Sequence, residues 1–365
     1  LHSLGFTSLL GLPMLLLSWP VLLINMLSAD ARMYSGFYQY SAEIVPLVIA
    51  ASALGIGVVA KLAGKRSPRA ARWTATLLSA IVLIFSGLDA WNDGFMPGAR
   101  GYIVPSVGAH QRLERNLLAT IPGNAVIAAA DEIEPHLSDR YWAYLLPTVH
   151  PSNGPEAQYI ALDASIPALP VEPHTLHAVA THALSHGFGI AAARDGVLIL
   201  RRGSTRHRLP TAFYSFVFDS NAHVTPGGER WGRLSLTGLV VHPKNNLVNR
   251  SRPAVAVDTY WQTRARLPSG TRIVFYLSPV YSGAAPRFRQ DWFSQSDTPT
   301  LDWLPAPAWP VHTQIHVASL PLIPPPGVSG KVDVAVGVYG LSPARGSRTR
   351  IAGRVVRLGT IAVHG

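Results

Sequence analysis

The sequence predicts a membrane protein with two folded domains: three transmembrane α-helices, then a small extracytoplasmic α/β domain, then an all-β sandwich. Three observations predict this fold class. Long apolar runs are confined to roughly the first 90 of the 365 residues. Strand and helix patterns then alternate, and after residue 203 strand patterns recur between Pro/Gly turns. We therefore expect domains at 1–91, 92–203 and 204–365.

The three apolar runs are each long enough to cross a hydrocarbon core of about 30 Å, which takes roughly 17–25 helical residues. We expect spans at about 4–27, 42–62 and 73–91. The first run lacks the basic start and the cleavage site of a signal peptide. Pro13 and Pro20 predict a kinked span inside a bundle. Because the first residue is Leu1 rather than Met, we expect the chain to begin inside a longer reading frame.

The connection between the second and third spans, expected at 61–72, is strongly basic. It contains no acid and five cations, which are Lys61, Lys65, Arg66, Arg69 and Arg72. The positive-inside rule places this loop in the cytoplasm and everything after Trp91 on the other side of the membrane. The sequence therefore predicts a multi-pass protein of a bacterial inner (cytoplasmic) membrane, with the lipid bilayer as its first partner.

The overall composition excludes several functions. Five of the net +11 charges lie in the basic loop, and the remaining cations form no basic helix and no nucleic-acid-binding motif, so nucleic acid is not an expected partner. The absence of Cys excludes disulfides, thiol catalysis and Cys-ligated zinc. The sequence also lacks a Gly-x-Ser-x-Gly elbow and an HExxH motif. No cofactor is predicted.

In the α/β region, amphipathic spacing predicts a helix at His110–Thr120 and another at Glu172–His186, the latter ended by Gly187. Asp131 is expected to cap a brief helix through Leu137. Expected strands are Ala125–Ala129, Tyr141–Leu145, Tyr159–Asp163, Phe188–Ala193 and Val197–Arg201, the last two joined by a hairpin turn at Arg194-Asp195-Gly196.

The C-terminal region shows strand patterns at the spacing of an antiparallel sandwich. Expected strands are Phe213–Asp219, Arg233–Val241, Val255–Arg264, Thr271–Leu277, His312–Ala318, Val332–Tyr339 and Gly353–Val363. Leu301–Pro310 and Pro324–Gly327 are expected to be long connections. Six aromatic residues of this region could stack on sugar rings, although such residues are more often core: Trp231, Tyr260, Trp261, Trp292, Trp303 and Trp309.

Four histidines on the helix at 172–186 raise the question of a metal site. His174, His177, His182 and His186 spread over about half the helix circumference at 100° per residue, which favours a solvated face over a ligand cage. We therefore predict no metal there.

Two groups of residues are candidates for substrate binding. The first lies in and next to the aromatic segment Ser28–Ser41, where Arg32, Tyr40 and Glu43 either form part of an interfacial belt or line a lipid-phosphate or substrate pocket. The second is His136, Ser138 and Arg140. Arg140 either contacts a phosphate or anionic sugar or pairs with a neighbouring acid, the candidates being Asp131, Glu132 and Glu134.

Several short strings carry a family resemblance. They are Gln39-Tyr40-Ser41-Ala42 leading to Pro46, Pro135-His136-Leu137-Ser138-x-Arg140, Tyr159–Asp163 and Asp195-Gly196-Val197-Leu198-Ile199-Leu200-Arg201. In these strings the first 200 residues resemble the C-terminal part of a family of uncharacterised bacterial polytopic membrane proteins, known only as a domain of unknown function. That family is distantly similar to the GT-C glycosyltransferases. Where the family often has His-Tyr, this chain has Gln39-Tyr40.

The C-terminal region separately resembles the β-sandwich appended to many membrane glycosyltransferases. The strings that carry this resemblance are Thr259-Tyr260-Trp261, Gln290-Asp291, Pro299–Trp303 and Val336-Gly337-Val338-Tyr339.

The resemblance implies that the chain is the C-terminal portion of a glycosyltransferase that uses a polyprenyl-phosphate-linked sugar. It also implies that the catalytic carboxylate, which such enzymes carry on their first extracytoplasmic loop, lies outside this sequence, so the catalytic residues are unknown. The alternative is a non-catalytic envelope module that binds glycan or a partner protein. Exposed aromatic residues on the sandwich and the absence of a carboxylate-lined cavity would favour this alternative.

Overall fold

The computed structural model divides the chain into two compact units, residues 1–105 with 245–250 and residues 106–244 with 251–365. We describe each unit by itself. The residues that the structure describes are 2–28, 42–94, 97–99, 102, 107–166, 171–218, 225–244, 254–279, 294–295, 298–319, 322, 330–341, 348–350 and 355–363.

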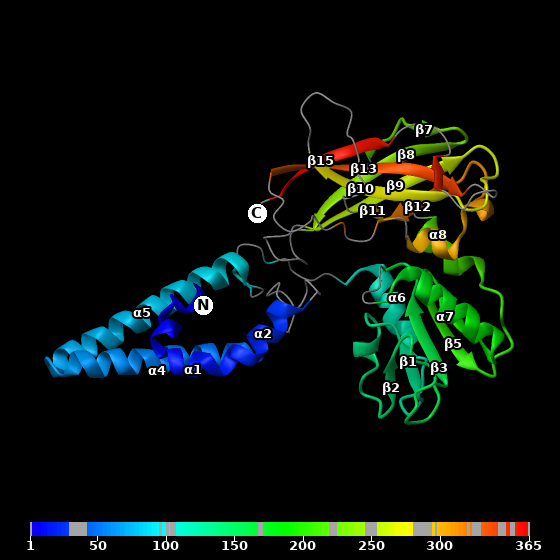
Figure 1. Ribbon diagram of the computed structural model, residues 1–365. Helices are drawn as coiled ribbons and strands as arrows, with labels where there is room; N and C mark the ends of the chain where they lie inside the picture. The colour runs from blue at the N-terminus through cyan, green and yellow to red at the C-terminus, as the bar shows by residue number, and fades with distance from the viewer. Residues whose placement is uncertain are drawn as a thin grey trace. The chain divides into compact units, whose positions relative to one another are not determined.

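The first unit contains three segments long and apolar enough to span a membrane, Thr7–Leu27, Ile44–Gly64 and Pro68–Asn92 (Figure 1). The first segment is preceded by a 3₁₀ turn, η1 (His2–Leu4), and is not one regular helix. It consists of η2 (Thr7–Gly11), α1 (Leu12–Leu15), η3 (Leu16–Ser18) and α2 (Trp19–Leu27). Pro13 and Pro20 each lie in the first turn of an α-helical piece, where the missing N–H is tolerated. The irregular first span predicted from these prolines is confirmed.

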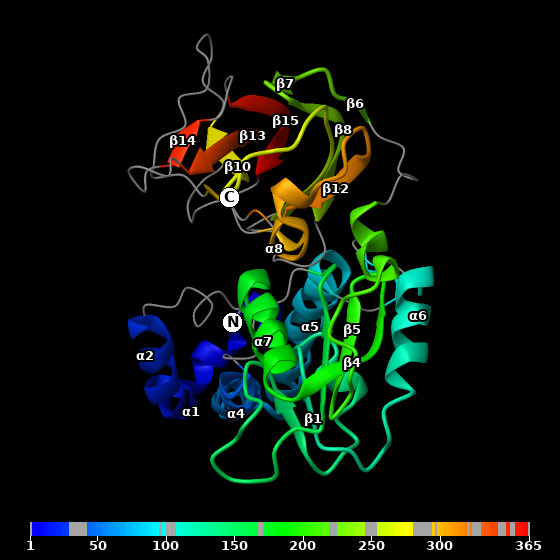
Figure 2. The ribbon, with the colours of Figure 1, turned by 90° about the vertical axis from the view of Figure 1, so that its right-hand side faces the viewer.

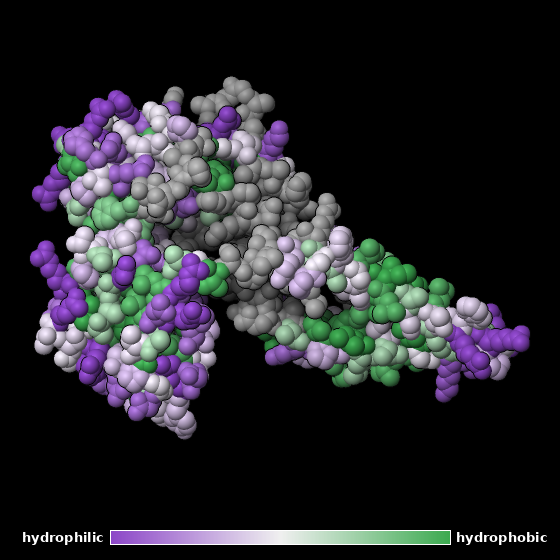
Figure 3. All heavy atoms as spheres, turned by 180° about the vertical axis from the view of Figure 1, so that it is seen from behind, coloured by the Kyte–Doolittle hydropathy of each residue, from purple (hydrophilic) through white to green (hydrophobic). Residues whose placement is uncertain are grey.

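The second and third segments are α4 (Ile44–Gly64) and α5 (Pro68–Asp93), so their connection is only Lys65–Ser67. The expected loop at 61–72 was too long, because Lys, Ala and Arg are good helix formers and extend both helices. Ser67 caps α5 by accepting a hydrogen bond from the Ala70 N–H at 3.1 Å. The basic side chains therefore cluster at one tip of the helical unit, which is purple in Figure 3.

The surface of this unit is apolar and its interior holds small polar groups. Leu83, Ile84 and Trp73 are exposed, whereas Ser8 and Ser52 are buried. The Thr7 and Ser52 hydroxyl oxygens lie 2.5 Å apart between the first segment and α4. Exposed apolar side chains with small residues at helix contacts are typical of helices that pack in lipid.

The second unit begins with a five-stranded mixed sheet in the order β2-β1-β3-β5-β4. Its strands are β1 (Ile127–Ala129), β2 (Ala143–Leu145), β3 (Tyr159–Asp163), β4 (Phe188–Arg194) and β5 (Val197–Arg202). β1 pairs in parallel with β2 and β3, and the other pairs are antiparallel. This confirms the α/β fold class.

One helix covers each face of this sheet (Figure 2). Successive side chains of β1 point to opposite faces of the sheet. Ile127 and Ala129 therefore pack with Leu118 of α6 (Ala109–Leu118), while Ala128 lies in the same buried cluster as the apolar residues of α7 (Pro173–Ser185). The brief helix expected after Asp131 is the 3₁₀ turn η5 (Glu134–His136).

The rest of the unit forms two antiparallel sheets, ordered β11-β10-β13-β14 with β15 on β13, and β12-β9-β8-β6 with β7 on β8. The strands are β6 (Thr225–Pro226), β7 (Arg230–Trp231), β8 (Leu234–Lys244), β9 (Ala254–Thr263), β10 (Arg272–Pro279), β11 (Ser294–Gln295), β12 (Gln314–Ala318), β13 (Gly330–Leu341), β14 (Arg348–Arg350) and β15 (Val356–Val363). Val257, Trp261, Phe275 and Val334 belong to the buried cluster between the sheets. The predicted all-β class is confirmed.

One expectation for this region was wrong. Phe213–Asp219 was expected to be a strand, but Thr211–Val217 forms the 3₁₀ helix η6 after Pro210. Its apolar residues face two different clusters instead of one side of a sheet, since Phe213 packs in the α/β core and Val217 in the sandwich core.

The expected connection at Leu301–Pro310 contains no strand, as predicted, but it includes the end of α8 (Pro299–Trp303) and η7 (Ala306–Ala308). Thr298 caps α8, and Trp303 inserts into the α/β core. The expected connection Pro324–Gly327 lies outside the described residues.

Candidate functional site

A cluster of ionisable side chains lies at the edge of the mixed sheet where the parallel strands end. β2 and β3 flank β1 on opposite sides, so the chain reverses direction across the sheet at β1. Ligands bind open α/β sheets at such switch points, outside the carboxyl ends of the strands. Asp131 follows β1, and Asp163 is the last residue of β3. The turn between β4 and β5 lies at the same edge because Val197 pairs with Asp163.

His110, from the first turn of α6, stands between two carboxylates. Its Nε2 lies 2.6 Å from Asp163 Oδ2 and its Nδ1 lies 2.8 Å from Asp195 Oδ2. The Asp163 side chain is 1% exposed and that of His110 is 22% exposed. When His110 is protonated, both ring nitrogens donate a hydrogen bond to an ionised acceptor, which is the strong class of hydrogen bond.

Two serines hold these carboxylates in place. The N–H and the hydroxyl of Ser165 donate to Asp163 Oδ1 at 2.8 and 2.7 Å. The hydroxyl of Ser215 donates to Asp195 Oδ1 at 2.9 Å. Each aspartate therefore keeps its Oδ2 directed at His110 while its Oδ1 is occupied.

The β4–β5 turn requires glycine at its second position. Asp195 and Gly196 have φ values of 50° and 82°, and a Cβ on Gly196 would stand 2.8 Å from both Asp163 Oδ1 and the Ser165 Cβ. The Asp195 and Gly196 N–H groups donate to the carbonyls of Ala212 and Phe213 at 2.8 Å. The turn is thus fixed between Asp163 and η6, and this places Asp195 against His110.

The hydrogen bond to Asp163 raises the pKa of His110 to about 9, and the second carboxylate adds to this effect against the opposing effect of burial. At neutral pH the imidazole is therefore charged. The Asp163–His110–Asp195 group is an ion triad with a net charge of about −1 when both carboxylates are ionised.

Further carboxyl groups surround the triad. Glu114 lies one turn after His110 on α6, and burial raises its pKa. Burial, with neighbouring Asp131, raises the pKa of Glu132 to about 8. One oxygen of Asp131, Oδ1, is buried and has no hydrogen-bond partner in the part of the chain that the structure describes. Several carboxyl groups therefore gather at this edge of the sheet, where burial shields them from much of the solvent that would stabilise their charged forms.

The ligand atoms of His110, Glu114 and Asp163 all lie within 4.8 Å of one another. One nitrogen and two carboxylate oxygens at this spacing can hold a metal ion. In the described part of the chain, no other set of three His, Asp or Glu side chains brings its donor atoms this close together.

A cavity of about 630 Å³ opens beside the triad. His110, Ser165 and Asp195 line it from the sheet edge, and Ser215 and Phe216 from η6. From the sandwich come Thr300 and His316, the latter with its Nε2 3.0 Å from Asp258 Oδ1 and its ring stacked on Tyr260. The sheet edge, η6 and the sandwich thus all contribute residues to this cavity. Its volume is within the range of small-molecule sites.

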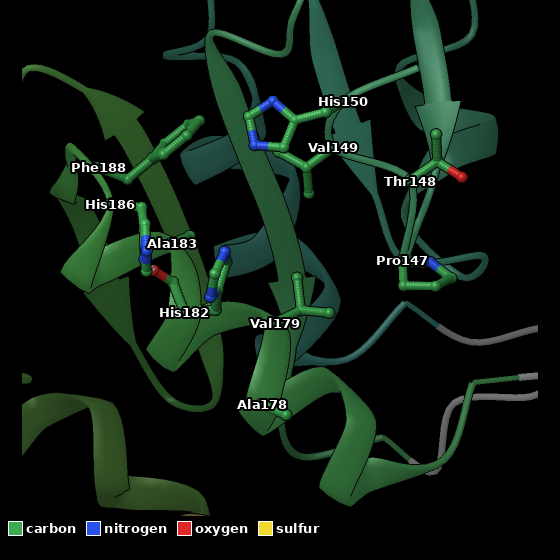
Figure 4. A pocket seen from close by; sticks show the side chains of 10 residues that line it. All are labelled: Pro147, Thr148, Val149, His150, Ala178, Val179, His182, Ala183, His186 and Phe188. Carbon is green, nitrogen blue, oxygen red and sulfur yellow. Dashed lines mark hydrogen bonds between the residues drawn. The ribbon is translucent and has the colours of Figure 1, made fainter. Parts of the chain in front are cut away.

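A second cavity of about 490 Å³ lies beside α7 (Figure 4). His150, His182, His186 and Phe188 are among its lining residues. The His182 and His186 rings stack at 3.9 Å between centroids, and His186 Nδ1 lies 2.8 Å from the His182 carbonyl oxygen.

The four histidines of α7 do not share one environment. His174, His182 and His186 are exposed. His177 packs edge-on against Trp303 at 4.9 Å between centroids, and its burial lowers its pKa.

Arg140, one of the predicted substrate-binding residues, is occupied by its own chain. Its guanidinium donates to the carbonyls of Ile121, Pro122 and Leu137 and to Asp139 Oδ1 at 2.9 Å, and its side chain is 7% exposed. The expected partners Asp131, Glu132 and Glu134 are not the acid that it contacts. This arrangement supports a structural role, in which one guanidinium satisfies three backbone carbonyls.

Three of the other predicted site residues belong to the described part of the chain. Ser138 is exposed and donates to the Pro135 carbonyl at 3.0 Å. His136 is exposed on η5 but lies near enough to oppose the rise in the pKa of Glu114. Glu43 is exposed at the start of α4 in the other unit. Arg32 and Tyr40 lie outside the described residues.

Five of the six candidate aromatic residues of the C-terminal region are core residues. Trp231, Tyr260, Trp261, Trp303 and Trp309 are all at most 5% exposed. Trp292 lies outside the described residues. The described rings therefore offer no exposed platform for a sugar.

Sequence reasoning missed the triad although each member stood inside a recognised element. His110 was seen as the start of a helix, Asp163 as the end of a strand and Asp195 as a turn residue. The available signal was positional: Asp131-Glu132 follows one short buried strand and Asp163 ends another, and such positions meet at one edge of a parallel sheet.

Comparisons with known proteins bear mainly on the N-terminal half. No curated protein matches the chain. A Bifidobacterium adolescentis GH3 beta-glucosidase aligns with 86% of this chain and 63% of its own, at 9% identity and a TM-score of 0.17. The chain thus spans less than two thirds of that enzyme, and a similarity this low carries no argument about fold or activity.

One family does match, and it is described as "Predicted membrane protein (DUF2079)". The match covers residues 1–199, which include the three apolar helices and nearly the whole mixed sheet with His110, Asp163 and Asp195. The chain is therefore a multi-pass membrane protein and belongs to the DUF2079 family of predicted membrane proteins, whose function is unknown.

Proposed function

We propose that this chain is the C-terminal portion of a GT-C-like glycosyltransferase of a bacterial inner membrane, and that its cavity binds the saccharide of a polyprenyl-phosphate-linked sugar or of the acceptor. The observation that carries the proposal is the cavity beside the triad, lined by His110, Asp195, Ser165 and Ser215. Carboxylates, hydroxyls and an imidazole are the groups that hydrogen-bond sugar hydroxyls.

The cavity also has a suitable size and wall. Its volume of about 630 Å³ accommodates one or two sugar rings, and Phe216 and Phe218 supply apolar surface beside the polar groups. A combination of a few fixed polar groups with aromatic surface is typical of small-ligand sites.

The alternative proposal is a non-catalytic envelope module that binds glycan or a partner protein through the sandwich. Exposed aromatic rings would support it, but five of the six candidate rings are described and all five are buried. The cavity lined by the Asp195 carboxylate supports the enzyme instead.

The proposed location of both folded domains outside the cytoplasm is supported by the basic tip between α4 and α5. Lys61, Lys65, Arg66, Arg69 and Arg72 all lie on or beside this three-residue connection. Because this chain contains no Cys, Ser67→Cys and Ser152→Cys each introduce a unique thiol for labelling in intact inner-membrane vesicles of known orientation. An impermeant maleimide should label Ser152→Cys from the extracytoplasmic side only. Labelling of Ser67→Cys from that side would overturn the orientation.

The function is tested with the full-length parent reconstituted in vesicles and a radiolabelled polyprenyl-phosphate sugar, with transfer and binding measured separately. Ala318→Trp fills the proposed cavity from the end of β12, and Ala178→Trp fills the second cavity as a matched control. We expect the first variant to lose binding or transfer at least tenfold and the control to keep both.

Two results would overturn the proposal. Neither binding nor transfer by the wild-type parent, across a panel of polyprenyl-linked sugars, would reject the reaction class. Unchanged binding and transfer in a folded Ala318→Trp variant would reject the cavity as the saccharide site.

A further inference from the structure

We propose that His110, Glu114 and Asp163 bind one divalent transition-metal ion, of the Zn²⁺ or Mn²⁺ type. The inference goes beyond the proposed glycosyl transfer and does not depend on it, because it rests on the donor atoms and not on the cavity's ligand.

The three residues present their donor atoms from two rigid elements. His110 and Glu114 are four residues apart on α6, so their side chains share one face of the helix. Asp163 ends β3, which lies in the middle of the sheet. Their donor atoms fall within 4.8 Å of one another, and sites built on helices and strands hold such geometry better than loops do.

Glu114 supplies an independent observation that points to a ligand. The residue is only 8% exposed, and no hydrogen bond from the described residues reaches its carboxylate. Removing a carboxylate from most of its water is costly, and its neighbour Asp163 is also an acid. A cation between the two carboxylates gives Glu114 a partner and removes the repulsion.

The surroundings are those of a supported metal site. Ser165 occupies Asp163 Oδ1 with two hydrogen bonds, which leaves Oδ2 for the ion. Asp195 accepts from His110 Nδ1 at 2.8 Å, which fixes the ring so that Nε2 faces Asp163. Carboxylate–histidine–metal arrangements of this kind orient the ligand and raise its basicity.

Metal binding displaces the proton on His110 Nε2 into solvent, and the geometry otherwise needs only small side-chain movements. In a tetrahedral site with bonds of about 2.1 Å, donor atoms are about 3.4 Å apart. The His110 Nε2–Asp163 Oδ2 separation of 2.6 Å must widen, and the longest separations, up to 4.8 Å, must shorten. Rotations of the Glu114 and Asp163 side chains supply both changes.

The donor set selects the type of ion. An imidazole nitrogen disfavours Mg²⁺ and Ca²⁺, which prefer all-oxygen sites, and the absence of thiolate disfavours soft ions such as Cu⁺. Three protein ligands leave one or more positions open, and His110 also lines the cavity of about 630 Å³. Water or a ligand oxygen from the cavity takes an open position.

The test uses the full chain purified in detergent, freed of metal with a chelator and titrated with Zn²⁺, Mn²⁺, Mg²⁺ or Ca²⁺ by isothermal calorimetry. We expect one Zn²⁺ or Mn²⁺ per chain, and at least tenfold weaker binding of Mg²⁺ and Ca²⁺. Glu114→Gln keeps the size of the side chain and should weaken binding at least tenfold. Asp195→Asn, which removes the carboxylate that orients His110 but none of the three ligands, should weaken binding by about 10–100-fold.

The matched control is the double variant His182→Ala/His186→Ala, because these stacked, exposed histidines are the competing source of zinc binding. It should bind the ion as the wild type does. X-ray absorption of the zinc-loaded wild type should show one imidazole nitrogen with oxygen ligands, so the proposal stays testable if a variant fails to fold. No stoichiometric binding, unchanged binding in folded Glu114→Gln, or binding lost in the control would each overturn it.

Discussion

His110 Nε2 and Asp163 Oδ2 lie 2.6 Å apart although 53 positions separate the two residues in the sequence. α6 supplies the imidazole and the carboxyl end of β3 supplies the acid. The packing of α6 on its face of the sheet therefore creates the site.

Replacing His110 should destabilise the second unit. His110→Gln leaves Asp163 almost fully buried without its cationic partner, and breaking a buried pair by removing one member costs about 2–4 kcal/mol. Urea unfolding followed by tryptophan fluorescence measures the change in the free energy of unfolding. His174→Gln, at an exposed position paired with Glu172, is the control and should cost under about 0.5 kcal/mol. Equal effects in both variants would mean that the triad contributes nothing.

The metal-free protein should lose stability as the pH rises from about 6.5 to 9. The pKa of His110 is raised from 6.5 in the unfolded chain to about 9 in the folded protein. Its contribution is therefore fully present below 6.5 and is lost as the pH passes through 9. After allowance for solvent screening we expect a loss on the order of 1–2 kcal/mol. Thermal melting from pH 6 to 10 measures it, and the part due to His110 should be missing in His110→Gln.

Glu132→Gln should stabilise the protein at alkaline pH. The pKa of Glu132 is raised to about 8, so its protonated form is favoured in the folded state and its stabilising contribution is lost as the pH rises through 8. A neutral amide avoids that loss. At pH 9 we expect a gain of about 1 kcal/mol, or about 2–4 °C in Tm, and little difference at pH 5. A variant less stable than the wild type at pH 9 would contradict this sign.

Gly196→Ala should cost more than Gly203→Ala. Both glycines have a positive φ, 82° and 79°, so both variants share the backbone strain of about 1 kcal/mol. The added methyl would collide with Asp163 and Ser165 at position 196 and meets nothing within 4 Å at position 203. The difference in the free energy of unfolding, about 1–3 kcal/mol, isolates the steric effect. Equal losses would mean that the turn moves away from the triad without cost.

Gly55→Leu should separate the first segment from α4. A Cβ at Gly55 would stand 2.7 Å from the Gly11 N atom and 2.6 Å from the Leu10 Cβ, whereas at Gly57 it meets nothing within 4 Å. Lipid-packed helices depend on such small residues for close approach. In detergent, Gly55→Leu should lower the aggregation temperature by several degrees and Gly57→Leu should leave it unchanged. The same behaviour in both variants would exclude this contact as a packing interface.

Much of the fold could be predicted from local sequence alone. β3 has the expected limits, Tyr159–Asp163, because a short buried run ending in an acid is a strong local signal. The strand expected at Phe213–Asp219 failed because its aromatic residues pack in two different cores, and periodicity cannot reveal which core a side chain enters. The basic loop was overestimated for a related reason, since charge patterning marks a side of the membrane and not the end of a helix.

The sequence by itself determined the membrane class, through unbroken apolar runs, and the α/β-then-β order of the folded domains, through a change of periodicity. It also supplied every residue of the site. Only the tertiary structure decided that His110, Glu114, Asp163 and Asp195 meet. It also decided that the Arg140 guanidinium donates hydrogen bonds to three backbone carbonyls. The reason is physical: helix and strand formation depend on neighbours in the chain, whereas a charge cluster depends on how distant elements pack and which charges they remove from water.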